Sequence, residues 1–372
     1  MRTGLVLEGT SFLFRMSFFS RQFDKLLQAV STDIGVDLGT ANTLVYVKGK
    51  GIVLNEPTIV ALNKKTGQLV AVGTAAKNMQ GRTPSHIEVV RPLVEGVISD
   101  FEVTEEMLAF VINKVRSDMR TVIAPRILVG VPCGITNVEM RAARDAAKNA
   151  GAREVFLVEE PMAAAIGAKL PVEKAVGNMI IDIGGGTANI AVISYGGIVV
   201  SENLRIAGDH LNAAIITYIR DQFKLLVGEK TAEDAKIKLA SITHGDDLQE
   251  LVVRGRDVVT GLPREVVITD SDIRDAIATP VDTIVETIRG VLEKTPPEVL
   301  ADIMQRGIHL SGGGALIPGF ASLLEEVIQV PVIIVADPLK AVVRGTGIIL
   351  ENLEVYEEVL IDNEGELTPN LS

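Results

Sequence analysis

Two segments of the chain repeat one pattern about 145 residues apart, and this repeat limits the possible folds more than any other feature. Residues 37–53 read DLGTANTLVYVKGKGIV, and residues 182–199 read DIGGGTANIAVISYGGIV. Each segment follows a short apolar strand and places an aspartate before a Gly/Thr turn. Each then continues into a second strand, a glycine-containing turn and a third apolar stretch. The repeat predicts two similar α/β halves that face one another.

Each repeated turn has the composition of a phosphate-binding hairpin. Glycine has no Cβ, so the backbone N–H groups of Gly39 and of residues 184–186 can approach an anion closely. The hydroxyls of Thr40, Thr43 and Thr187 can also donate to phosphate oxygens. An aspartate precedes each turn and suits Mg²⁺, which takes one or two carboxylates and keeps several waters. Two such turns on opposite halves predict a clamp for a Mg²⁺–triphosphate.

A carboxylate at the start of a predicted helix is the candidate for placing the attacking water. Residues 155–158 read as a strand, and Glu159, Glu160 and Pro161 precede an alanine-rich run. Proline suits the first turn of a helix, and the helix dipole stabilises an acid there. Glu160 could orient a water toward the terminal phosphate, because proteins catalyse phosphoryl transfer mainly by positioning the reacting groups. The alternative role of Glu160 is simple helix capping, and Glu159 is expected to be a bystander.

Two further segments could hold the rest of a nucleotide. Glu233 and Lys236 lie one turn apart on a helix predicted to begin at Thr231, where they could grip ribose hydroxyls and a purine edge. The alternative is an ordinary solvated ion pair. Residues 307–310 are predicted to form a strand, and a helix is predicted to begin at Pro318. Between them, residues 311–315 form a glycine loop with room for a flat ring or a phosphate.

The composition excludes several other classes of protein. The chain has 372 residues, enough for about two domains, and a formal net charge of −12. That charge argues against a nucleic-acid partner, which would require clustered basic residues. Cys133 is the one cysteine, so no disulfide can form within the chain, and we expect its side chain to pack as a small hydrophobe. No window of the sequence reaches the ~18 apolar residues of a spanning helix.

Residues 1–32 differ from the rest of the chain. They hold five of the ten phenylalanines, and four basic residues against two acidic ones give them a local net charge of +2. Residues 17–31 place their apolar side chains on one stripe of a helix, which predicts an amphipathic helix in a membrane interface. The alternative is packing on the protein itself or on a neighbouring subunit, and Met16 is an alternative start. The predicted membrane-contacting side chains are Phe18, Phe19, Phe23, Leu26 and Leu27.

Taken together, these motifs resemble the MreB family of bacterial actin homologues, within the actin, Hsp70 and sugar kinase superfamily. The strongest matches are IGVDLGTANTLVYVKGKGIVLNEP and VFLVEEPMAAAIGA, and the resemblance extends over about residues 33–357. It implies an α/β, actin-like fold of the duplicated ribonuclease H-like type, with two domains of two subdomains each around a central nucleotide cleft. Domain I would span residues 33–171 (subdomains IA and IB) with the return of 346–360, domain II would span 172–345 (IIA and IIB), and residues 1–32 would form a membrane-binding extension.

The resemblance also implies roles for individual residues. Asp37 and Asp182 would lie on the Mg²⁺ side and act through water, and Glu160 and Thr187 would place the hydrolytic water. Ala188 and Asn189 depart from the threonine and acidic residue usual in the family. The ATP-binding residues implied in this way are Gly39, Thr40, Ala41, Asn42, Gly184, Gly185, Gly186, Thr187, Gly208, Glu233, Asp234, Ala235, Lys236, Gly312, Gly313, Gly314, Ala315 and Leu316.

The resemblance implies a function as well. It implies an ATPase that binds ATP or ADP with Mg²⁺ and couples hydrolysis to assembly into double antiparallel protofilaments. Such filaments would lie in the cytoplasm on the inner face of the cell membrane and maintain rod shape by scaffolding the cell-wall elongation machinery, with RodZ, MreC, MreD and RodA as partners. A loop with Val122 and Ile123 at its tip, near basic residues, would be a second membrane contact; the alternative is a buried turn. The alternative function is a sugar-kinase-like phosphotransferase, which would need a separate base aimed at a substrate hydroxyl.

Overall fold

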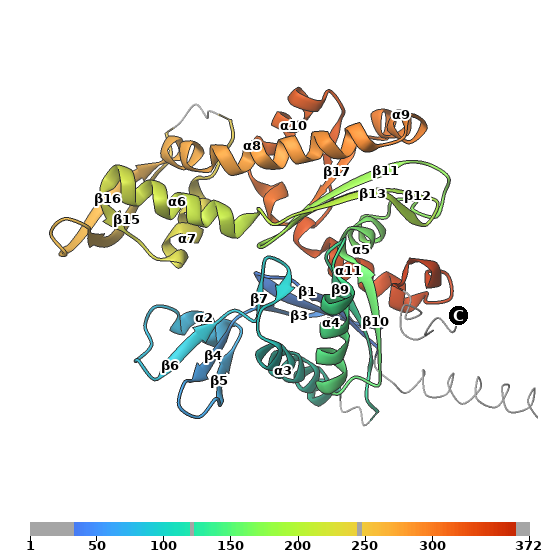
Figure 1. Cartoon of the computed structure of the whole chain (residues 1–372), viewed down its shortest axis with the longest axis horizontal. Coiled ribbons are helices and arrows are strands. Elements are labelled where there is room, and N and C mark those ends of the chain that lie inside the picture. Colours follow the sequence, from blue (N-terminus) through green and yellow to red (C-terminus); the bar gives the residue numbers. More distant parts are fainter. Residues whose placement is uncertain (1–32, 120–122, 244–247, 362–372) are drawn as a thin grey trace, which may run out of the picture.

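The computed structural model describes residues 33–119, 123–243 and 248–361. Two α/β halves lie face to face, and each is built on a five-stranded sheet (Figure 1). The predicted membrane-contacting residues before residue 33, together with Val122, lie outside the described residues. Ile123 is the first described residue after that gap and is partly buried. Within the described ranges, no helix is both long enough and apolar enough to span a membrane.

The first sheet contains the first copy of the repeat. Its strand order is β10-β9-β1-β2-β3, with β1, β2 and β3 antiparallel and β1, β9 and β10 parallel. Strand β9 is buried along its whole length: its apolar residues 127–131 favour burial, and Arg126 at its start pairs with the carboxylate of Asp33. The strands are β1 (Ile34–Leu38), β2 (Asn42–Val47), β3 (Gly51–Pro57), β9 (Arg126–Val131) and β10 (Glu154–Glu159).

The second sheet contains the second copy and has the same topology. Its order is β13-β12-β11-β17-β18, with the antiparallel hairpin strands on one side and the parallel strands on the other. Even the break in register recurs, after Val45 in the first sheet and after Val192 in the second. The predicted duplicated α/β fold is therefore confirmed. The strands are β11 (Asn178–Ile183), β12 (Ala188–Ser194), β13 (Gly197–Leu204), β17 (Ile308–Ser311) and β18 (Val332–Ile334).

Amphipathic helices cover the outer faces of the two sheets (Figure 1). Thr136 and Glu139 form a capping box at the start of α4, which packs on β9 and β10. On the second half, α8 packs on β12 and β13, and α9 packs on β11. These helices and their neighbours are α3 (Phe101–Met119), α4 (Asn137–Asn149), α8 (Asp270–Lys294), α9 (Pro297–Arg306) and α10 (Phe320–Ile328).

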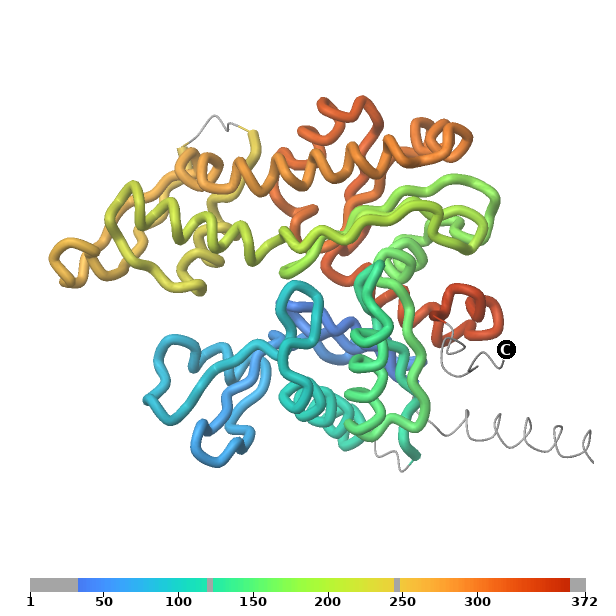
Figure 2. Tube along the Cα trace, in the orientation of Figure 1, coloured from blue at the N-terminus to red at the C-terminus, as the bar shows by residue number. Residues whose placement is uncertain are grey.

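Two helices between the sheets join the halves. Helix α5 (Glu160–Gly167) follows strand β10 of the first sheet but packs on β11 and β12 of the second. Helix α11 (Ala341–Glu351) comes from the second half and packs on β1 and β2 of the first. Figure 2 shows the chain passing between the halves at these green and red segments. Each half thus contributes a helix to the core of the other.

A small lobe extends from each half on the same side of the molecule (Figure 1). The lobe on the first half has sheet order β5-β4-β6, and the lobe on the second has order β14-β15-β16. The first comprises β4 (Val60–Asn63), β5 (Leu69–Val72), β6 (Ile87–Val90) and α2 (Thr74–Met79). The second comprises β14 (Leu225–Leu226), β15 (Glu250–Asp257), β16 (Pro263–Thr269), α6 (Gly208–Phe223) and α7 (Glu229–Leu239).

Two predicted helix starts were wrong by a few residues. Helix α7 begins at Glu229 rather than Thr231 and is preceded by Gly228, so the predicted cap at Thr231 lies inside the helix. Helix α10 begins at Phe320 rather than Pro318, because Gly319 has φ 81° and cannot continue a right-handed helix. The remaining short elements are β7 (Leu93–Val94), β8 (Val97–Ile98) and the 3₁₀ turns η1 (Gly313–Leu316), η2 (Pro338–Lys340) and η3 (Glu357–Val359).

Candidate functional site

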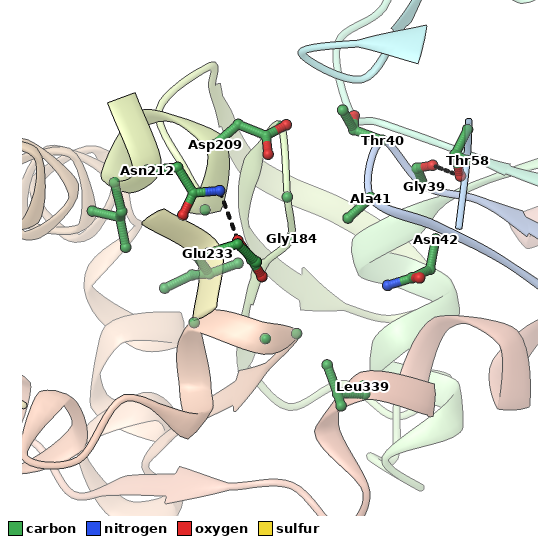
Figure 3. A pocket seen from close by; sticks show the side chains of 18 of the residues that line it. Gly39, Thr40, Ala41, Asn42, Thr58, Gly184, Asp209, Asn212, Glu233 and Leu339 are labelled. Carbon is green, nitrogen blue, oxygen red and sulfur yellow. Dashed lines mark hydrogen bonds between the residues drawn. The ribbon is translucent and has the colours of Figure 1, made fainter. Parts of the chain in front are cut away.

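A cavity of about 530 Å³ lies between the two halves and is lined by residues from both. This volume is typical of a small-molecule site. Figure 3 shows residues 39–42 on one wall and Gly184, Asp209, Asn212 and Glu233 on the opposite wall. The predicted residues that line the cavity are Asp37, Gly39, Thr40, Ala41, Asn42, Glu160, Asp182, Gly184, Gly185, Gly186, Thr187, Gly208, Glu233, Lys236, Gly312, Gly313, Gly314 and Leu316.

The two repeated turns meet at the base of this cavity. A Cβ added at Gly185 would lie 2.7 Å from the Cβ of Ala41, and one at Gly186 would overlap the Thr40 hydroxyl. Glycine is therefore required at both positions for the turns to approach this closely. The Thr40 hydroxyl accepts a hydrogen bond from the Gly96 N–H at 3.0 Å. Residues 37–43 and 184–187 thus open onto one cavity, which is the arrangement that the duplicated sequence predicted.

Side chains and helix ends outside the repeat fix the shape of each turn. The Thr58 hydroxyl donates to the Gly39 carbonyl at 2.6 Å, and Thr58 also shares a hydrogen bond with Thr43. In the second turn, the Gly184 carbonyl accepts from the Gly208 N–H at 3.2 Å. This contact brings the N-terminus of α6 to the cavity, where its N–H groups and dipole favour an anion. Sequence reasoning missed Thr58, because a single threonine after a strand carries no signal of its own.

Three of the carboxylates that line the cavity have raised pKa values: those of Asp37, Asp182 and Glu160. Burial, and after it the nearby charge of Asp182, raises the pKa of Asp37 to about 8. Burial raises the pKa of Asp182 to about 6, although the Ser311 hydroxyl donates to its carboxylate. Burial and then the charges of Asp37 and Asp182 raise the pKa of Glu160 well above its usual value. The charged forms of these carboxylates are therefore disfavoured unless a bound cation compensates them.

This donor set fits a hydrated divalent cation. The carboxylates of Asp182, which is buried, and Asp37, which is partly buried, precede the facing turns and have raised pKa values, so a bound cation would stabilise their charged forms. Mg²⁺ in particular takes few carboxylates and completes its shell with water and ligand oxygens. Across the ranges that the structure describes, no group of three or more His, Cys, Asp or Glu side chains is arranged to hold a metal by itself. A cation at Asp37 and Asp182 would therefore share its shell with the ligand in the cavity.

The raised pKa values of Asp37 and Asp182 make the stability of the chain depend on pH. Without a divalent cation, the free energy of unfolding should fall as the pH rises from about 4 to about 8. The folded chain keeps the proton of Asp182 up to about pH 6 and that of Asp37 up to about pH 8, whereas the unfolded chain has already released both. Thermal unfolding measured in EDTA across this range would show the decline, and Mg²⁺ with ADP should reduce it. Asp37→Asn is the control, and it should flatten the profile; an EDTA sample as stable at pH 8 as at pH 5 would contradict the prediction.

Glu160 and Thr187 share a partner behind the cavity. Asn189 Nδ2 donates to Glu160 Oε2 at 2.8 Å and to the Thr187 hydroxyl at 3.5 Å. Glu160 and Thr187 line the cavity, and Asn189 is completely buried behind them. The structure therefore brings together the two side chains predicted to place a water, and one buried amide holds both.

Glu233 and Lys236 form an ion pair at 2.7 Å on the wall of the cavity. Lys236 Nζ also donates to the Gly208 carbonyl at 2.9 Å, and Asn212 donates to Glu233 at 2.6 Å. Burial raises the pKa of Glu233, but Lys236 and Asn212 outweigh it, so the net pKa is below the usual value. The pair is thus held against the first turns of α6 rather than solvated on an open helix face. Sequence reasoning missed Asn212.

Three residues implied by the resemblance do not line the cavity. Asp234 is exposed on the helix surface away from it. Ala235 and Ala315 are buried in the hydrophobic core of the second half. All three residues are next to cavity-lining residues in the sequence, but their side chains lie on the helix surface or in the core.

Ion pairs cross the cavity between the two small lobes. Arg91, from the first half, contacts Asp209 at 2.9 Å and Glu229 at 3.2 Å, both from the second. Gln80 also donates to Glu229 at 3.0 Å. These charged pairs raise the pKa of Arg91 despite its partial burial. Sequence reasoning missed this bridge, because Arg91 and its partners are joined by the tertiary fold.

The duplicated sheets, the two exchanged helices and the cavity between facing glycine turns define the actin-like class of proteins. The chain belongs to the MreB/Mbl family, whose model matches residues 31–358. The cell shape-determining protein Mbl of Bacillus cereus is 50% identical over 87% of this chain and 96% of its own. The cell shape-determining protein MreB of Escherichia coli is 48% identical over 90% of this chain and 97% of its own.

Solved structures of a relative have the same fold. The crystal structure of MreB5 of Spiroplasma citri bound to ADP has a TM-score of 0.82 and 40% identity, covering 87% of this chain and 98% of its own. The same protein bound to AMPPNP has a TM-score of 0.83 and 39% identity, covering 88% of this chain and 98% of its own.

Proposed function

We propose that this chain is an actin-like ATPase that assembles into filaments and takes part in determining cell shape. The observation that carries the proposal is the meeting of two glycine turns with Asp37, Asp182 and Glu160 in one cavity. Family membership and the cell shape-determining relatives support it. The ADP and AMPPNP complexes of MreB5 support a nucleotide as the ligand of this cavity.

The parts of the cavity suit the parts of a nucleotide. The turns at residues 39–42 and 184–187 would hold the phosphates through their N–H groups and hydroxyls. The paired Glu233 and Lys236 would contact the ribose and base, and the Gly312–Leu316 loop would lie against the ring. Mg²⁺ held through water by Asp37 and Asp182 would neutralise phosphate charge when bound. With these assignments, the terminal phosphate would lie near Glu160.

Glu160 and Thr187 would position the attacking water. The carboxylate of Glu160 can accept a proton or a hydrogen bond from water, and the Thr187 hydroxyl can fix its direction. The proposal needs no separate acceptor site, since water itself is the acceptor. Phosphate release in the absence of any sugar or acyl acceptor would therefore distinguish it from a phosphotransferase.

Membrane attachment and partners complete the proposal. The amphipathic pattern at Phe18, Phe19, Phe23, Leu26 and Leu27 supports attachment to a membrane surface by residues 1–32. By family membership, the filaments would be double antiparallel protofilaments on the inner face of the cell membrane. They would scaffold RodZ, MreC, MreD and the RodA synthase for cell-wall elongation.

Sedimentation and phosphate release together test the proposal. The full chain with Mg²⁺-ATP should pellet and release phosphate, and EDTA should suppress phosphate release. With phosphatidylglycerol vesicles the chain should float with the lipid, whereas a chain beginning at residue 33 should lose flotation and keep its phosphate release. Neutral phosphatidylcholine vesicles are the matched lipid control. A chain that stays soluble and releases no phosphate under all these conditions would refute the proposed function.

A further inference from the structure

Asn189 joins groups from both halves of the molecule. It lies on β12 of the second sheet and is completely buried. Its partner Glu160 begins α5, directly after β10 of the first sheet, and its other partner Cys133 follows β9 of the first sheet. The contacts of one side chain therefore depend on how the two halves fit together.

The chemistry of its neighbours allows only one orientation of the Asn189 amide. Its Oδ1 accepts from the Cys133 N–H at 3.3 Å and from the Cys133 thiol at 3.5 Å. Its Nδ2 donates to the Glu160 carboxylate at 2.8 Å. Flipping the amide would turn its N–H groups toward the Cys133 N–H, which cannot accept, and its oxygen toward the Glu160 carboxylate, which is an acceptor itself. The Cys133 peptide therefore aims the Asn189 donor at Glu160.

A second amide strengthens this arrangement. Asn203 on β13 is the cross-strand neighbour of Asn189. Its Nδ2 donates to the Cys133 carbonyl at 3.2 Å, so Asn189 and Asn203 hold the two polar groups of the same residue's backbone. The loop after β9 is thereby fixed to the second sheet, and the position of Asn189 relative to Glu160 is fixed with it.

Resting on the proposed ATPase function, we propose that Asn189 is a positioning residue for hydrolysis. Its amide fixes the distance between the Glu160 carboxylate and the Thr187 hydroxyl, so that both groups can contact the same water. Asn189 does not line the cavity, so it acts through these two side chains and not on the nucleotide. Losing it should slow the hydrolytic step and spare nucleotide binding, since small displacements of a positioning group cost about 10- to 100-fold in rate.

The test compares two buried asparagines. Asn189→Ala should lower the kcat of phosphate release about 10- to 100-fold, with the KM for ATP and the affinity for a fluorescent ADP analogue changed by less than about 3-fold. Asn178→Ala is the matched control: Asn178 is equally buried on β11 of the same sheet, and its side chain contacts Val176 and Arg306. This variant should keep the wild-type kcat. If Asn189→Ala misfolds, Asn189→Leu fills the same space without the amide and should show the same loss.

A double substitution separates this inference from the proposed function. In a Glu160→Gln background, Asn189→Ala should cause little further loss of kcat, because both changes disrupt the same step. Additive losses, a wild-type kcat in both Asn189 variants, or an equal loss of ADP affinity would overturn the positioning role while leaving the ATPase intact. A wild-type chain that binds nucleotide but never hydrolyses it would instead overturn the proposed function, and this inference with it.

Discussion

Replacing Glu160 by glutamine is expected to lower the rate of ATP hydrolysis by about 100-fold or more and to leave nucleotide affinity within a few-fold. Glutamine keeps the shape of the side chain but cannot accept a proton from water. Glu160 lines the cavity, is 7% exposed and has a pKa raised by burial and by Asp37 and Asp182. Single-turnover phosphate release, measured beside binding of a fluorescent ADP analogue, would separate the hydrolytic step from binding.

The adjacent acid provides the control for this prediction. Glu159 ends strand β10 and does not line the cavity. Glu159→Gln makes the same chemical change one residue away, and it should leave the rate within about 2-fold of wild type. Equal losses in both variants would point to a disturbed helix start, and a Glu160→Gln chain as fast as wild type would show that another group places the water.

The repeat was the most predictive feature because turn chemistry is local. An aspartate followed by glycines and threonines determines a hairpin within a few residues, and two copies predict two similar sheets. The structure confirms this down to the shared register break after Val45 and Val192. The capping box of Thr136 and Glu139 was predictable for the same reason, since both partners lie within one helical turn.

Contacts between distant segments could not be predicted in the same way. Arg91 faces Asp209 and Glu229, which follow it by more than a hundred residues. Asn212 reaches Glu233 only because α6 packs on α7. Neither position has a distinctive local pattern, so only the folded chain reveals that these side chains belong to the cavity.

Helix geometry explains why only two of four consecutive residues predicted to bind the nucleotide face the cavity. Residues 233–236 were assigned together to the nucleotide, but successive residues on a helix point about 100° apart. Glu233 and Lys236, three residues apart, share the face toward the cavity. Asp234 faces outward, and Ala235 packs into the core.

Replacing Gly345 by alanine is expected to destabilise the whole chain, because this glycine lies where α5 and α11 cross. A Cβ at Gly345 would overlap the backbone carbonyl of Ala163, and one at Gly167 would overlap the carbonyl of Ala341. Backbone cannot move aside as a flexible side chain can, so the two helices must separate. Such overpacking costs about 1–3 kcal/mol or more, which exceeds the gain of up to about 1 kcal/mol from alanine's higher helix propensity.

Gly290→Ala makes the opposite test in another helix. Gly290 lies within α8, and a Cβ there would meet nothing within 4 Å. The same substitution should therefore raise the midpoint of thermal unfolding slightly at Gly290 and lower it by about 1–4 °C at Gly345. Because α5 begins at Glu160 and α11 contributes Val342 to the cavity, the Gly345 variant should also bind nucleotide more weakly. Equal midpoints for the two variants would mean that the helix crossing accommodates a methyl group and does not hold the halves at a fixed distance.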